Sequence, residues 1–103
     1  MLCAIKLHKE DDYLISFSGD GYSFNIVIPL KGKDKNKIYR FMDKILNHSI
    51  KYDAIIYLAK DEYLPKDIFK IMYPKYNDFL KIKNNIDPND LFQSDMYRRL
   101  LKD

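Results

Sequence analysis

An uninterrupted apolar run at residues 54–59, Ala-Ile-Ile-Tyr-Leu-Ala, limits the fold of this chain more than any other stretch. The run is rich in β-favouring residues and shows no helical period over its short length, so it predicts a buried strand. Lys60 and Asp61 follow directly and Pro65 comes soon after, so we expect the strand to end near Lys60. A lysine there can project towards a ligand, although a solvated turn is the commoner role of such a pair.

Three further segments carry strand signals, and together they predict a small, mainly antiparallel sheet of about three to four strands. Residues 2–7 and 13–17 are apolar, and residues 22–30 alternate between apolar and polar side chains. In the last segment Tyr22, Phe24, Ile26 and Ile28 share a face that we expect to join the core. The turn residues at 18–21 predict a hairpin.

The rest of the chain has helical patterns, so the fold class is α+β, with a crossover helix and a helical carboxy-terminal segment. Asp34 is a plausible N-cap for the crossover helix. Its apolar residues recur at helical spacing and predict a core-facing side: Ile38, Phe41, Met42, Ile45 and Leu46. We expect the carboxy-terminal helices at about 65–72, 76–84 and 91–101.

Length and composition exclude several classes of protein. The 103 residues allow one domain, and a net charge of +3 does not call for a nucleic-acid partner. The single Cys3 excludes an internal disulfide, no Cys/His pair has metal-ligand spacing, and a Cys3/His8 catalytic dyad is not favoured. No apolar run approaches about 20 residues, so we expect a cytoplasmic chain without a membrane-spanning helix.

Four motifs follow one another in an order that resembles a known family. They are Tyr57-Leu58-Ala59-Lys60-Asp61, Met72-Tyr73-Pro74, Asp87-Pro88 and the segment FQSDMYRRL at 92–100. In this order they resemble the carboxy-terminal end of the FAD-linked oxidases, most closely the decaprenylphosphoryl-ribose 2-oxidases of bacterial cell-wall arabinan synthesis. The resemblance implies that residues 1–103 are a single partial domain, the carboxy-terminal part of the substrate (cap) domain.

The resemblance also suggests functional residues. Tyr57 and Lys60 match the family's active-site tyrosine and lysine, so we predict catalytic and substrate-binding roles for both. Asn25 stands where the family has a reactive cysteine, and it is predicted either to bind substrate or to face water. Three residues apart on a regular strand, Tyr57 and Lys60 would lie on opposite faces, so they converge only if the strand twists or ends between them.

The resemblance further implies an oxidoreductase that acts on a sugar CH–OH group and needs FAD. No glycine-rich phosphate-binding loop occurs among Gly19, Gly21 and Gly32, and a strand begins almost at Met1. We therefore expect the product of a split gene, inactive without a separate amino-terminal FAD-binding half. The substrate would be a polyprenyl-phosphoryl sugar or a related polyol, through which the chain could meet the inner membrane. Two alternatives stay open: a small free-standing basic binding module without catalysis, and a nonfunctional gene remnant.

Overall fold

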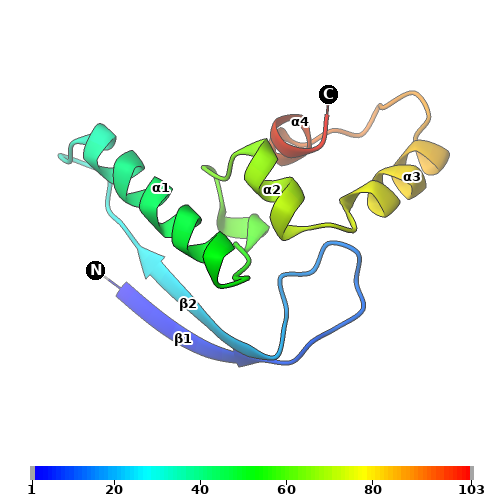
Figure 1. Cartoon of the computed structure of the whole chain (residues 1–103). Helices are drawn as coiled ribbons and strands as arrows, with labels where there is room; N and C mark the ends of the chain where they lie inside the picture. The colour runs from blue at the N-terminus through cyan, green and yellow to red at the C-terminus, as the bar shows by residue number, and fades with distance from the viewer. Residues whose placement is uncertain (1, 103) are drawn as a thin grey trace.

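The structure, a computed structural model, describes residues 2–102, and the α+β class is confirmed (Figure 1). These residues form one antiparallel hairpin, one 3₁₀ turn and four α-helices. The strands are β1 (Leu2–His8) and β2 (Gly21–Val27), and the 3₁₀ turn η1 spans Leu58–Lys60. The helices are α1 (Lys35–Lys51), α2 (Lys66–Met72), α3 (Tyr76–Ile86) and α4 (Asp95–Leu100).

The sheet is smaller than predicted: among the described residues it has two strands rather than three or four. The expected strand at residues 13–17 is wrong: this segment belongs to the long connection between β1 and β2. The Asp11 carboxylate accepts hydrogen bonds from the Tyr13 backbone N–H and the Ser16 hydroxyl, and the Ser16 hydroxyl accepts one from the Ser18 N–H. These local side-chain hydrogen bonds replace the ladder that a strand would need.

Helix α1 begins where the sequence predicted. The Asp34 side chain accepts hydrogen bonds from the backbone N–H groups of Asn36 and Lys37. At its carboxy-terminal end, Asp53 adopts a positive φ of 53°, and Ala54 N–H donates to the Ser49 carbonyl. This is the pattern of a Schellman cap, which reverses the direction of the chain immediately before the apolar run.

The predicted strand at residues 54–59 is therefore wrong, and with it the crossover role of α1. The segment is extended but pairs with no other strand among the described residues, and its end winds into η1. The strand-like alternation is nevertheless present, because Ile56 and Leu58 pack against the core whereas Ile55 and Tyr57 point outward. Instead of a ladder partner, the Ile56 carbonyl accepts a hydrogen bond from the Tyr73 hydroxyl.

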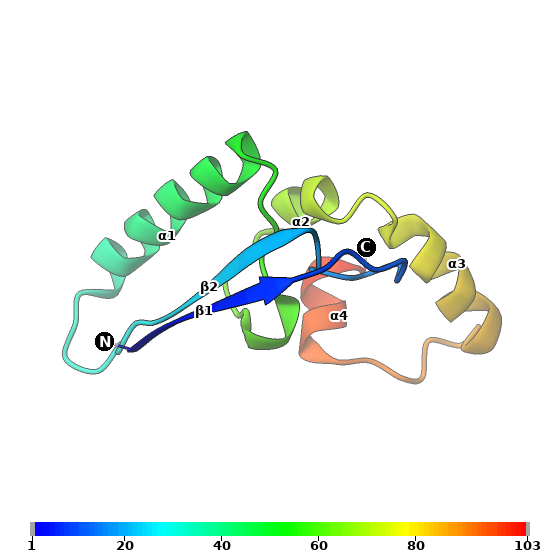
Figure 2. The same ribbon diagram turned by 90° about the horizontal axis from the view of Figure 1, so that it is seen from below.

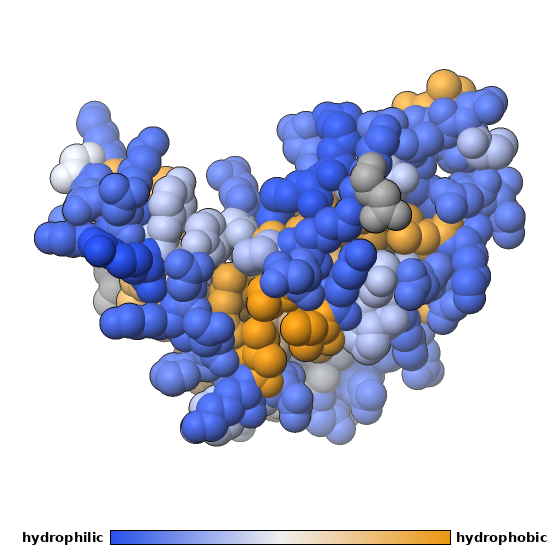
Figure 3. Space-filling view, turned by 45° about the horizontal axis from the view of Figure 1, so that its top comes forward, coloured by the Kyte–Doolittle hydropathy of each residue, from blue (hydrophilic) through white to orange (hydrophobic). Residues whose placement is uncertain are grey.

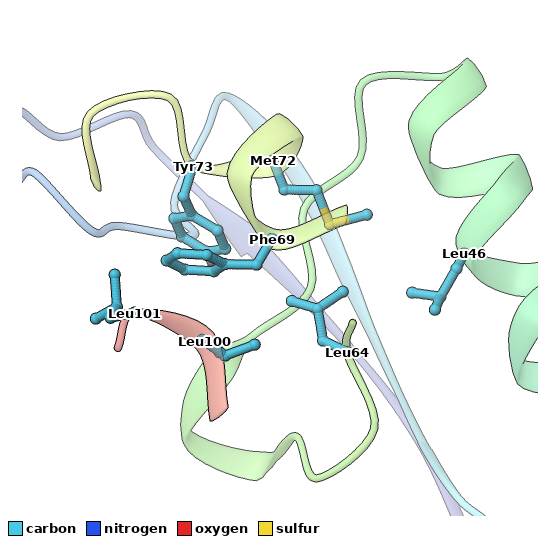
Figure 4. Close-up of a cluster of buried hydrophobic side chains, with 7 residues drawn as sticks. All are labelled: Leu46, Leu64, Phe69, Met72, Tyr73, Leu100 and Leu101. Carbon is cyan, nitrogen blue, oxygen red and sulfur yellow. The ribbon is translucent and has the colours of Figure 1, made fainter. Parts of the chain in front are cut away.

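The core lies among the helices and contains no residue of the hairpin. Figure 4 shows the rings of Phe69, in α2, and Tyr73, its C-cap, side by side, with Leu100 and Leu101 below them and Leu46 of α1 farther off. The ring centroids of this pair are 5.3 Å apart. Seven side chains form the buried cluster: Leu46, Leu64, Phe69, Met72, Tyr73, Leu100 and Leu101.

Several predicted core residues are not in this cluster. The predicted core face of β2, with Tyr22, Phe24 and Ile26, is exposed, and so is Phe41 of α1. The last helix is also shorter than predicted, because it begins at Asp95 and leaves Leu91 and Phe92 exposed. In the part of the chain that the structure describes, no element covers these side chains.

The surface is hydrophilic over most of the face shown in Figure 3, where apolar side chains gather near the middle. Among residues 2–102, no helix combines the length and apolar character needed to cross a membrane.

Candidate functional site

Tyr57 and Lys60 flank the 3₁₀ turn that follows the extended segment. Tyr57 is the N-cap of η1, and Lys60 is its last residue, with its backbone N–H directed at the Tyr57 carbonyl. Tyr57 has extended backbone angles and precedes the turn, so the two predicted active-site residues lie at its two ends, one turn apart. Both side chains are solvent-exposed.

An aromatic row connects Tyr57 to the hairpin. The Tyr57 ring contacts Phe17 with centroids 4.4 Å apart, and Phe17 in turn meets the His8 ring edge-on at 5.0 Å. His8 Nε2 and the Ser23 hydroxyl are hydrogen-bonded at 2.7 Å. The sequence gives neither Phe17 nor His8 a role in this site, since it predicts Phe17 in a strand. Only the tertiary structure brings the connection between β1 and β2, which contains Phe17, against Tyr57.

Two neighbouring cavities open beside η1. One of about 210 Å³ is bounded by Tyr57, Phe17 and Tyr73. The other, of about 490 Å³, lies between the 9–20 connection and helices α3 and α4. Both include Ile15, Leu58 and Met96 in their walls, and the two are here called the groove. Its lining is mainly apolar, with Lys83, Gln93 and Ser94 contributing polar groups at the larger end.

Asn25 lies on β2 opposite Ala4 and is exposed. It shares a face of the hairpin with His8 and Ser23, which is the face that leads towards Phe17 and Tyr57. Within residues 2–102, no hydrogen bond joins Asn25 to Tyr57 or Lys60. The structure thus places Tyr57 and Lys60 at the two ends of η1 and Asn25 on the same side of the hairpin as the aromatic row, and the substrate roles of all three remain predictions.

The Asp61 carboxylate is held in structural interactions. Its side chain is 6% exposed and accepts hydrogen bonds from the backbone N–H groups of Tyr63 and Leu64. It also pairs with Arg99 of α4 at 2.9 Å, while the same guanidinium donates to the Leu64 carbonyl at 2.6 Å. This ion pair fastens the last helix to the residues that follow η1. Arg98 pairs with Asp95 on the exposed surface.

A second ion-pair cluster, formed by Lys83, Asp87, Asp90 and Lys102, borders the larger cavity. Lys83 Nζ lies 2.9 Å from Asp87 and 2.7 Å from Asp90, and Lys102 Nζ lies 3.1 Å from Asp90. The hydrogen bonds that Lys83 donates lower the pKa of Asp87 and lower that of Asp90 to about 2. The same hydrogen bonds, to Asp90 and then Asp87, raise the pKa of Lys83. The charges are mutually neutralised, which favours a structural role.

Other reactive groups offer little chemistry. Cys3 and His8 lie at odd and even positions of β1, so their side chains project from opposite faces and do not form a dyad. No group of His, Cys, Asp and Glu in residues 2–102 is arranged to hold a metal ion. Burial and the nearby Asp61 raise the pKa of the Tyr73 hydroxyl, which stays protonated and donates to Ile56.

Comparison with known proteins relates the chain to an oxidase. It is 28% identical over 86 residues to decaprenylphosphoryl-beta-D-ribose oxidase of Mycolicibacterium smegmatis, an alignment that covers 84% of this chain and 18% of the relative. It is also 24% identical over 86 residues to an uncharacterized protein in the mprA 5' region of Streptomyces coelicolor, over 84% of this chain and 23% of the relative. The chain thus spans about a fifth of the length of the curated relatives it matches. No family model matches.

Proposed function

We propose that this chain is the carboxy-terminal, substrate-binding part of an FAD-linked oxidase that acts on a sugar CH–OH group. It would be active only in a complex with an amino-terminal flavin-binding half. The observation that supports this most directly is the position of Tyr57 and Lys60 at the two ends of η1, within a segment similar to a ribose oxidase. The 18% coverage of that relative is what a part of a larger enzyme would give.

The residues present fit the substrate side of such a site. A lysine ammonium can hold a phosphate or an alkoxide-like oxygen, and a phenol can hydrogen-bond a sugar hydroxyl. Tyr57 lies at the wall of the smaller cavity, and Lys60 is exposed and free to turn towards a ligand there. Bound flavin would accept a hydride as the hydroxyl becomes a ketone. This chain has no glycine-rich loop for FAD, so the partner would hold it.

The test is co-expression of the tagged chain with the product of the reading frame immediately upstream. Flavin absorbance in the purified material, in a stoichiometric complex, is the expected result, and polyprenyl-phosphoryl ribose oxidation would then be assayed. A soluble, folded chain that retains neither flavin nor partner would contradict the proposal and favour the free-standing binding module. Salt-sensitive retention on nucleic acid would give that module a ligand.

A further inference from the structure

The hairpin has one face made entirely of uncharged, mainly apolar side chains. The register pairs Cys3 with Ile26, Ile5 with Phe24 and Leu7 with Tyr22. Because side chains alternate across a strand, these six residues project from the same side, here named the hairpin outer face. Each is solvent-exposed, and Phe24, which forms one of its central pairs, is 67% exposed.

No element of the described residues covers this face. Figure 2 shows no other element in front of the hairpin backbone, and the exposed fractions of Ile5 and Leu7 are 61% and 70%. None of its residues belongs to the core cluster or packs against it. An isolated two-stranded hairpin is marginally stable in water, and apolar patches of several hundred Å² on a soluble protein commonly mark an interaction surface.

We propose that two copies of this chain pack their hairpin outer faces together to form a four-stranded sandwich. From the exposed fractions, the six side chains present on the order of 700 Å² per copy, close to the ~800 Å² per partner of a standard stable interface. Two sheets that pack face to face at about 10 Å interdigitate alternating apolar side chains of this kind. The area is therefore sufficient for a dimer.

A second copy matches this face in chemistry. Its own outer face has the same apolar composition, and since it has no Lys, Arg, Asp or Glu, self-association brings no like charges together. Edge-to-edge pairing of strands would leave the face in water. The opposite face of the hairpin has His8, Ser23 and Asn25, so the dimer leaves the groove beside Tyr57 open. The inference does not depend on the proposed oxidase function.

Ile26 and Val27 provide a matched pair of variants. They are neighbours on β2, 47% and 49% exposed, and project from opposite faces. Sedimentation equilibrium of the full chain, from low micromolar to near-millimolar concentration, should show a reversible monomer–dimer equilibrium. Ile26→Asp should weaken association by at least about tenfold, because it desolvates a charge in the interface. Val27→Asp should leave association unchanged. A wild-type monomer throughout, or equal effects of the two variants, overturns the proposal.

Cys3 gives a second measurement that needs no substitution on the face. Its thiol is exposed in the single chain and lies within the proposed interface. The rate constant for maleimide labelling should fall severalfold between the dilute and the concentrated sample, since the dimer covers the thiol. A rate constant independent of concentration overturns the proposal. So does protection of Cys3 that appears only when the upstream-encoded chain is added, because the occupant would then be that chain.

Discussion

The Arg99 guanidinium and the Asp61 carboxylate meet at 2.9 Å although they are 38 residues apart in the chain. Arg99 also donates to the backbone carbonyls of Asp61 and Leu64. The contact fastens helix α4 to the residues that directly follow Lys60. The orientation of η1, and so of the predicted active-site pair, depends on this long-range ion pair.

Arg99→Ala should lower the free energy of unfolding by about 2 kcal/mol, because it leaves the nearly buried Asp61 carboxylate without its cation. Urea unfolding followed by circular dichroism measures this change. The control is Arg98→Ala, which breaks only the exposed pair with Asp95 and should cost less than about 0.5 kcal/mol. Equal losses in the two variants would contradict the structural role of Arg99.

Tyr73→Phe should destabilise the protein by about 1–2 kcal/mol, because the Ile56 carbonyl loses its hydrogen-bond donor while the buried ring is kept. The control is Tyr13→Phe, because the Tyr13 side chain is exposed. It should leave the free energy of unfolding unchanged. The difference between the urea unfolding midpoints of the two variants gives the contribution of the Tyr73 hydroxyl to stability. A neutral Tyr73→Phe would mean that this hydroxyl does not hold the extended segment in place.

Acid should destabilise the protein through the Lys83 cluster. The pKa of Asp90 is lowered from 3.8 to about 2, so its ion pairs contribute fully above about pH 4 and are lost as the pH falls towards 2. In Asp90→Asn, the unfolding free energy should fall less between pH 4 and pH 2 than in the wild type. Part of the fall should remain, because the pKa of Asp87 is also lowered. Unfolding curves at several pH values test this. Asp12→Asn, in an exposed loop, should retain the wild-type slope.

Lys60→Met tests the predicted catalytic residue in the reconstituted complex. Because an ammonium that stabilises developing negative charge contributes on the order of a hundredfold, kcat/KM should fall by about that factor. The unfolding midpoint should not change, since Lys60 is exposed. Lys44→Met, exposed on α1, is the control and should keep full activity. Wild-type turnover in Lys60→Met would show that the catalytic assignment is wrong.

Several helix ends were predicted correctly, because their physical cause is local. Asp34 caps α1, Tyr73 follows the end of α2, and α3 begins at Tyr76, since capping and helix termination depend on neighbouring residues. The hairpin predicted at 18–21 is wrong in its partner, because β2 pairs with β1 and not with residues 13–17. The sequence by itself determined the α+β class and most helix positions.

Tertiary structure decided what these elements contact. The run at 54–59 alternates as a strand does, but a strand needs a partner for its backbone, and here the Tyr73 hydroxyl takes that place for Ile56. The end of the run winds into a 3₁₀ turn between Tyr57 and Lys60, which no strand pattern could indicate. Alternation in β2 likewise identified an apolar face but not its exposure, because burial depends on whether another layer is present to cover it.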